Sequence, residues 1–153
     1  MTLAPDRRTD DVSKDRLRLW IRLLKATRMI EADLRERLRT EFGTTLPRFD
    51  LMAALHRHEA GLKMSQLSGV LRVSNGNVTG LVDRLAADGM LSRSTIAGDR
   101  RAALVRLTDE GRIAFEAQAK AHERWIHEAL DEFDSTEAQA LAQRLVALTA
   151  SEE

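Results

Sequence analysis

The 153-residue sequence contains no cysteine, no tyrosine, only two prolines and only eight glycines. Without cysteine the chain forms no disulfide, no thiolate metal site and no cysteine-based redox sensor. The sequence also lacks a run of about 18 apolar residues, which a membrane-spanning helix needs. Because the polar segment 1–11 has no apolar core of a secretory signal, we expect a cytoplasmic location.

Aromatic residues are scarce, with two Trp and four Phe, whereas Ala, Leu, Arg and Glu are abundant. These abundant residue types favour helix, and the length suits one compact domain. We therefore expect a mainly α-helical protein with little sheet. The sequence contains no Gly-rich phosphate loop and no Gly-x-Ser-x-Gly pattern, so it predicts no enzyme.

The net charge is zero, but the charges are spread unevenly along the chain. Residues 61–106 hold seven Lys or Arg and three Asp or Glu, a net charge of +4. Residues 107–153 hold four and eleven, a net charge of −7. DNA responds to the local field of one face rather than to the total charge. Such asymmetry also arises by chance, so a nucleic-acid partner needs support from the pattern of elements.

A long amphipathic helix is predicted from about Ser13 to Phe42, where Gly43 provides a stop signal. At roughly 45 Å this helix is too long for a domain of this size to cover, so we expect part of its apolar stripe to contact a second chain. Residues 1–12 are expected to be flexible. The stripe comprises Leu17, Trp20, Ile21, Leu24, Thr27, Ile30, Leu34, Leu38 and Phe42.

Three shorter helices are expected next, over residues 44–59, 65–71 and 74–88. Pro47 suits the first turn of the first of them, and Gly89 supplies a stop after the last. The last two helices, joined by a three-residue break, form a helix-turn-helix. The residues predicted to face the core are Phe49, Met52, Ala53, Leu55, Leu67, Val70, Leu71, Val78, Leu81, Val82 and Leu85.

The periodicity changes after this helix-turn-helix. Residues 90–96 and 102–107 have the pattern of two strands, and residues 97–100 carry turn chemistry. A hairpin in this place is the wing of a winged helix. Helices are expected over residues 108–133 and from Asp134 onward, where a capping box starts the last one. The candidate buried residues of the first are Ile113, Ala117, Ala121, Trp125, Leu130 and Phe133, and Leu141, Leu145 and Leu148 lie along one face of the last helix.

The helix over residues 74–88 carries the side chains that we expect to read DNA bases. The first turns of a recognition helix enter the major groove, where Asn pairs with adenine and Ser or Thr meets bases or phosphates. Arg84, two turns on, is placed to hold a phosphate. An ordinary helix also exposes such side chains to solvent. The candidates in the first turns are Ser74, Asn75, Asn77, Val78 and Thr79.

The predicted hairpin is basic, because residues 89–106 contain Asp99 as their single acid. An arginine at the tip of a hairpin enters a minor groove, where the potential is most negative at A·T tracts. The alternative is that these cations only keep an exposed ribbon soluble. A basic hairpin directly after a polar-faced helix is more specific than either feature alone. Its arginines are Arg93, Arg100, Arg101 and Arg106.

Three segments occur in a fixed order along this region. The first is Ser-Asn-Gly-Asn-Val-Thr-Gly-Leu-Val-Asp-Arg-Leu at residues 74–85, and the second is Gly89 with Arg93. The third is Asp-Arg-Arg at 99–101, followed after five residues by Leu-Thr at 107–108. With the order of helices over residues 13–150, these segments resemble the MarR family of bacterial regulators, whose wing carries Asp-x-Arg-x5-Leu-Thr.

The resemblance implies a winged helix-turn-helix with a two-stranded wing over residues 46–107. It also implies a helical dimerisation region from both termini, residues 13–45 and 108–150. The first and last helices of two chains would interlock in a homodimer, and the dimer would bind a pseudo-palindromic double-stranded DNA operator.

Carried over from the family, residues 74–88 form the recognition helix. Asp99 would brace the wing by pairing with Arg101, and either Arg100 or Arg101 would reach the minor groove. Members of the family respond to a small, often aromatic or acidic ligand that binds between the dimer helices and the DNA-binding lobe. Binding there shifts the spacing of the two recognition helices, and release of a repressor is the commoner mode.

Residues 46–51 and 74–77 resemble a branch of the family that controls the breakdown of aromatic acids. The resemblance implies an effector that is a small aromatic acid or its CoA thioester, such as a hydroxycinnamoyl-CoA. A CoA ligand needs cations for its phosphates, and Trp20 is a candidate for an aromatic pocket or else for packing. The available cations are Arg16, Arg18, Arg22, Arg28 and Arg48.

Neither a metal site nor a cofactor is expected. His56 and His58 are two residues apart on a helix and point in nearly opposite directions, and His122 and His127 have a poor ligand spacing. The alternative function is a helical dimer that binds a protein partner and does not bind DNA.

Overall fold

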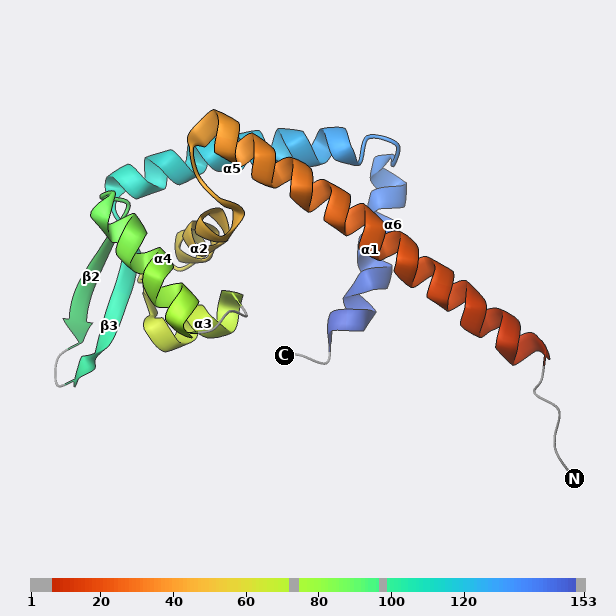
Figure 1. Ribbon diagram of the computed structural model, residues 1–153, viewed down its shortest axis with the longest axis horizontal. Helices are drawn as coiled ribbons and strands as arrows, with labels where there is room; N and C mark the ends of the chain where they lie inside the picture. Colours follow the sequence, from red (N-terminus) through yellow and green to blue (C-terminus); the bar gives the residue numbers. More distant parts are fainter. Residues whose placement is uncertain (1–6, 72–74, 97–98, 151–153) are drawn as a thin grey trace, which may run out of the picture. The chain divides into compact units, whose positions relative to one another are not determined.

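The computed structural model describes residues 7–71, 75–96 and 99–150, without the side chains of 7, 75–76, 96 and 99–102 (Figure 1). The described chain is mainly helical, as the sequence predicts, with six helices and three short strands. By its internal contacts it divides into two units, Met1–Ala119 and Lys120–Glu153, whose boundary falls inside one helix. None of the helices that the structure describes is long and apolar enough to cross a membrane.

The first helix, α1 (Arg7–Phe42), is longer than predicted. It begins six residues before Ser13, so residues 7–12 are helical, whereas the expectation for residues 1–6 lies outside the described part of the chain. Ion pairs from Lys14 to Asp10 at 3.6 Å and from Arg18 to Asp15 at 3.0 Å support its early turns. Gly43 ends the helix with φ +62°, as predicted.

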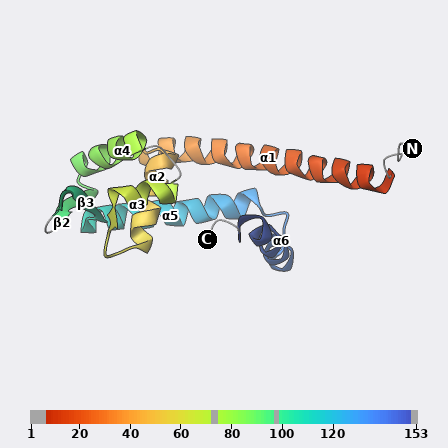
Figure 2. The ribbon, with the colours of Figure 1, turned by 90° about the horizontal axis from the view of Figure 1, so that it is seen from below.

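The centre of the first unit is α2 (Leu46–Arg57), which Thr45 caps by accepting a hydrogen bond from the backbone N–H of Arg48 at 3.4 Å. The helix ends at residue 57, two residues before the predicted end. Its buried residues point in several directions, so neighbouring elements cover most of its circumference (Figures 1 and 2). They are Phe49, Leu51, Met52, Ala54 and Leu55, whereas the predicted Ala53 is only half-buried.

The sheet has three antiparallel strands in the order β1-β3-β2: β1 (Leu62–Lys63), β2 (Leu91–Ile96) and β3 (Asp99–Leu107). The strand β1 was not predicted, because two residues show no periodicity. Its Leu62 pairs with Val105 of β3. The sheet therefore ties the helix-turn-helix to the wing.

The helix α3 (Met64–Leu71) and the helix α4 (Asn75–Ala87) follow β1. Val70 of α3 is 44% exposed, so its predicted inward position is wrong, whereas Leu67 is buried as predicted. The core of the first unit joins α1, α2, α3, α4 and β3. Its most completely buried side chains are Leu38, Leu51, Met52, Leu55, Leu67, Val78, Val82 and Val105.

The helices α5 (Asp109–Ala129) and α6 (Ser135–Thr149) complete the chain. The predicted capping box of α6 is present: Asp134 accepts a hydrogen bond from the N–H of Glu137 at 2.8 Å and its own N–H donates to the Glu137 carboxylate at 3.4 Å. In α5 the predicted apolar face is partly wrong. Ile113 and Ala117 of α5 are exposed, as are Leu130 and Phe133, which lie beyond its end at Ala129 although the helix was predicted to reach residue 133. The buried residues of α5 are Gly111, Phe115, Gln118, Ala121 and Trp125.

Candidate nucleic-acid interface

One face of α4 is buried and the other is open to solvent. Val78 and Val82 are fully buried, and Leu85 is 3% exposed. This apolar face fixes α4 in the first unit and turns the opposite face outward. On that opposite face, a Cβ built at Gly80 meets no atom within 4 Å, so nothing in the described chain stands over it. The exposed side chains are Asn77, Thr79, Asp83 and Arg84.

Several of the predicted base-reading residues can be placed. Asn77 and Thr79 lie on the outward face of α4, as expected for a recognition helix, whereas Val78 belongs to the core. Asn75 begins the helix, and Ser74, the predicted helix cap, lies outside the described residues.

The wing is the β2–β3 hairpin that follows α4. Its register pairs Leu91 with Leu107 and Arg93 with Val105, and it becomes irregular between Thr95 and Ile96. The returning strand begins at residue 99, three residues earlier than predicted, so residues 100 and 101 start that strand next to the hairpin tip. The predicted brace between the side chains of residues 99 and 101 lies outside the described atoms.

Arg93 is engaged within the protein. Its guanidinium donates a short hydrogen bond to the carboxylate of Asp83, so an ion pair joins β2 to α4. The two side chains remain 41% and 55% exposed. From the sequence, Arg93 was predicted to contact DNA and Asp83 was not predicted to pair with it, because the two residues lie on different elements and no helical or strand period relates them.

A compact junction connects the end of α4, the start of β2 and the start of α5. Gly89 ends α4 with φ +79°. Thr108 donates from its backbone N–H to the carbonyl of Met90 at 3.0 Å and from its hydroxyl to the carbonyl of Gly89 at 2.7 Å. The same hydroxyl accepts the N–H of Gly111 at 2.9 Å, which caps α5. The junction sets the position of the start of α5 relative to α4.

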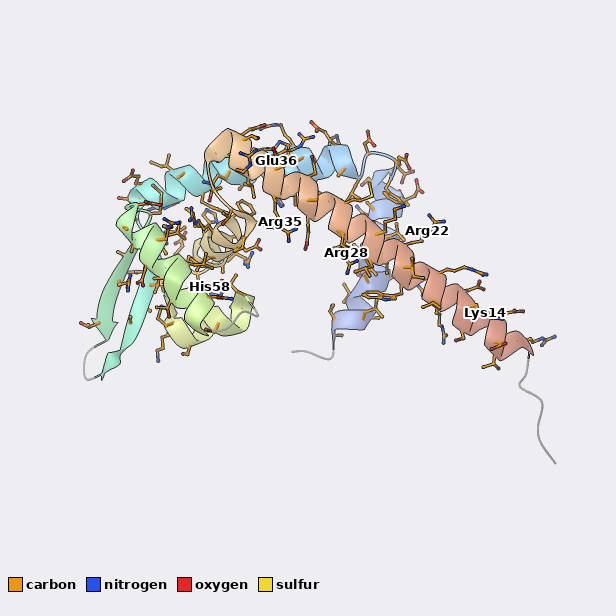
Figure 3. All side chains as sticks on the ribbon, viewed as in Figure 1. Lys14, Arg22, Arg28, Arg35, Glu36 and His58 are labelled. Carbon is orange, nitrogen blue, oxygen red and sulfur yellow. The ribbon has the colours of Figure 1, made fainter. Side chains whose placement is uncertain are left out.

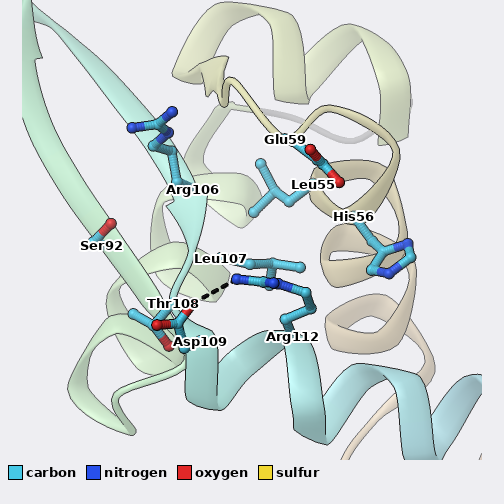
Figure 4. A pocket seen from close by; sticks show the side chains of 9 residues that line it. All are labelled: Leu55, His56, Glu59, Ser92, Arg106, Leu107, Thr108, Asp109 and Arg112. Atoms are coloured by element: carbon cyan, nitrogen blue, oxygen red, sulfur yellow. Dashed lines mark hydrogen bonds and ion pairs between the residues drawn. The ribbon is translucent and has the colours of Figure 1, made fainter.

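A hollow of about 420 Å³ lies at the base of the wing, and residues of α2, the hairpin and the start of α5 line it (Figure 4). Most of its lining is polar or charged, and Leu55 and Leu107 are its apolar residues. Arg112 pairs with Asp109 at 2.5 Å. The lining residues are Leu55, His56, Glu59, Ser92, Arg106, Leu107, Thr108, Asp109 and Arg112.

The predicted effector cations lie elsewhere. Trp20 is 56% exposed on α1, and Figure 3 shows Arg22 and Arg28 on the same helix. Arg16 is also exposed on α1, and Arg48 is half-buried on α2. Within the described chain none of these five residues lines the hollow at the wing base.

The histidines do not gather into a metal site in the part of the chain that the structure describes, where no three potential ligands cluster. His56 lies on the ring of Phe115, with 4.9 Å between ring centroids, and its Nε2 is 3.4 Å from the carboxylate of Glu116. These contacts join α2 to α5. His56 thus contributes to packing in the first unit.

Comparison with known proteins shows which family shares this sequence and fold. The sequence model of the MarR family matches residues 44–103. The HTH-type transcriptional regulator PecS of Dickeya dadantii is 35% identical over 102 residues, 63% of this chain and 61% of PecS, so the chain spans less than two thirds of that relative.

Solved structures extend the likeness to nearly the whole chain. Sco3205, a MarR family regulator of Streptomyces coelicolor in complex with DNA, has the same fold with a TM-score of 0.78 and 22% identity, covering 90% of this chain and 86% of that one. A MarR family transcriptional regulator of Silicibacter pomeroyi is 36% identical with a TM-score of 0.75, covering 94% of this chain and 99% of that one. The relatives are transcriptional regulators rather than enzymes, and the chain belongs to the MarR family.

Proposed function

We propose that the protein is a regulator of transcription that binds double-stranded DNA through α4 and the wing. The observation that carries the proposal is the outward polar face of α4 directly beside a basic hairpin in one unit. Asn77 and Thr79 would meet base edges in the major groove, and Arg100 or Arg101 at the hairpin tip would enter the minor groove. Sco3205, solved with DNA, supports this use of the fold.

We propose that two copies bind a pseudo-palindromic operator as a homodimer. Apolar side chains on α1 and α6 are exposed in the single chain, and an exposed apolar surface of this kind marks an interaction site. A second copy that covers them would also place a second α4 for the other half-site. The exposed residues are Leu17, Leu19, Trp20, Ile21 and Met29 of α1 and Leu141, Leu145, Val146 and Leu148 of α6.

We propose that a small aromatic acid or its CoA thioester releases the protein from its operator, and that the protein acts in the cytoplasm. The support is the resemblance of residues 46–51 and 74–77 to regulators of aromatic-acid breakdown. The exposed Arg16, Arg22 and Arg28 near Trp20 provide cations for the phosphates of CoA.

The DNA-binding proposal is tested by selecting duplexes from a random pool and measuring their affinity near physiological salt with excess unrelated duplex. Asn77→Ala should lower discrimination at one position by about 1–3 kcal/mol and should leave non-specific affinity nearly unchanged. Arg101→Ala should abolish specific binding to the selected duplexes. Arg57→Ala, which removes an equal charge from the exposed end of α2, is the control and should bind as the wild type does.

Failure to enrich any duplex would instead favour the alternative function, a helical dimer that binds a protein partner. Equal weakening of all sequences by Asn77→Ala would contradict base readout by that residue. The effector is tested by adding aromatic acids and their CoA thioesters to the DNA complex. Arg22→Gln with Arg28→Gln should weaken release by the thioester but not by the free acid, and Arg39→Gln on the same helix is the control.

A further inference from the structure

The wing and the recognition helix are connected by a single described ion pair between their side chains. We propose that the Asp83–Arg93 pair is a positioning pair that holds the wing at a fixed angle on α4, and that Arg93 makes no contact with DNA. This inference rests on the proposed use of α4 and the wing in DNA binding. It changes the role that the basic composition of the hairpin suggested for Arg93.

The geometry of the hairpin directs Arg93 toward α4. Register pairs place Arg93 beside Val105, which is fully buried, so both residues occupy the face of the ribbon that packs on the first unit. On α4, Asp83 comes one residue after the buried Val82, about 100° round the helix from it, and lies on the exposed side of α4. The carboxylate of Asp83 and the guanidinium of Arg93 meet where that side of α4 adjoins the hairpin.

A two-stranded ribbon on its own is only marginally stable. Here β1 pairs with Leu104 and Val105 of β3, and the Thr108 junction holds the base of the hairpin. Because Arg93 lies opposite Val105, its pair with Asp83 holds the other strand, β2, at the same level of the ribbon as β1. A contact on β2 at that level restricts hinge motion of the hairpin beyond it. Restriction before binding reduces the ordering cost when the wing meets a groove.

The positioning role predicts a change in DNA affinity opposite in direction to the change that charge alone predicts. Asp83→Asn removes a negative charge beside the DNA-facing surface, which by charge alone should strengthen binding. If the pair positions the wing, Asp83→Asn instead weakens specific binding by about two- to fivefold per protomer, which is the range of effects measured for exposed ion pairs. In a dimer both protomers lose the pair, so the affinity for the whole operator falls by roughly the square of that factor. Arg93→Gln should weaken binding to the same extent.

The matched control is Asp88→Asn. Asp88 is an exposed acid at the end of the same helix, and its side chain has no hydrogen bond or ion pair among the described residues. Asp88→Asn makes the same charge change without breaking a contact to the wing, so it should leave specific binding unchanged or slightly stronger. The charge-exchanged double variant Asp83→Arg with Arg93→Asp should recover most of the affinity that each single variant loses.

A measurement without DNA tests the positioning directly. Because the natural chain has no cysteine, Ala87→Cys on α4 and Ser94→Cys on β2 give two unique sites for spin labels. Pulsed dipolar spectroscopy, with labelled protein diluted in unlabelled protein, reports the distance distribution within one protomer. Asp83→Asn should broaden this distribution, and the charge-exchanged variant should narrow it again.

The outcomes separate the possibilities. An unchanged distance distribution in Asp83→Asn overturns the proposal whether or not DNA binds. If Arg93→Gln weakens binding while Asp83→Asn strengthens it, and charge exchange restores nothing, Arg93 contacts phosphate and the proposal is also wrong. If the wild type selects no duplex but the distribution broadens as expected, the positioning role stands and the DNA-binding function fails.

Discussion

The substitution Gly111→Ala should unfold the junction between α4, β2 and α5. A Cβ built at Gly111 would stand 2.9 Å from the carbonyl carbon of Met90 and closer still to its oxygen. Met90 has little room to move, because Gly89 before it has φ +79° and Leu91 after it is 4% exposed. Its carbonyl also accepts the 3.0 Å hydrogen bond from the N–H of Thr108.

The expected cost follows from these contacts. Overpacking a close contact costs about 1–3 kcal/mol, and each weakened hydrogen bond of the junction adds about 1 kcal/mol. Alanine has a higher helix propensity than glycine, which offsets less than about 1 kcal/mol of this cost in the first turn of α5. We therefore expect Gly111→Ala to lower the free energy of unfolding by about 2–4 kcal/mol.

Urea unfolding at one fixed protein concentration measures this change, since dimer stability depends on concentration. Gly69→Ala in α3 is the matched control, because a Cβ there meets nothing within 4 Å. It should raise the free energy of unfolding by about 0.5–1 kcal/mol. If Gly111→Ala is as stable as Gly69→Ala, the close approach of α5 to Met90 is not a constraint and the reasoning fails.

Three further changes test other parts of the structure. Leu38→Ala empties a fully buried position at the end of α1 and should cost about 2–5 kcal/mol in unfolding experiments. Asp134→Ala removes the cap of α6 and should cost about 1 kcal/mol, which helical circular dichroism during thermal unfolding will report. The hydrogen bond and charge of Arg39 lower the pKa of Glu36, so NMR titration of Arg39→Gln should find that pKa back near its ordinary value. Any stability from this pair is present above the ordinary carboxyl pKa and is lost as the pH falls through the lowered one.

The sequence predicted best those features that depend on residues three or four positions apart. The proline in the first turn of α2, the capping box at Asp134 and the stops at Gly43 and Gly89 are all local, and each is present where expected. Local hydrogen-bond chemistry and a positive φ decide these positions without reference to the rest of the chain. The order of the helices and of the hairpin along the chain was predicted from these local signals.

The features that sequence analysis missed depend on distant partners. The strand β1 exists because Leu62 finds Val105, 43 residues later in the sequence. The face of α5 was misplaced because that helix has apolar residues on two sides. Ile113 is 70% exposed, whereas Phe115 is 6% exposed. The spacing of apolar residues does not tell which side of a helix packs within its own chain and which side remains free to contact a second copy.

The charge of the wing shows why composition alone overstates a DNA-binding surface. The hairpin has four arginines, but the charge of Arg93 is paired with Asp83. Arg106 lies at the base, where its Cγ stands 2.7 Å from the position that a Cβ on Gly61 would take, and it lines the hollow beside α5. Only Arg100 and Arg101 start the returning strand next to the tip. In the proposed function, the charge at the outer end of the wing therefore comes from Arg100 and Arg101, whereas Arg93 is paired with Asp83 and the exposed Arg106 lies at the base.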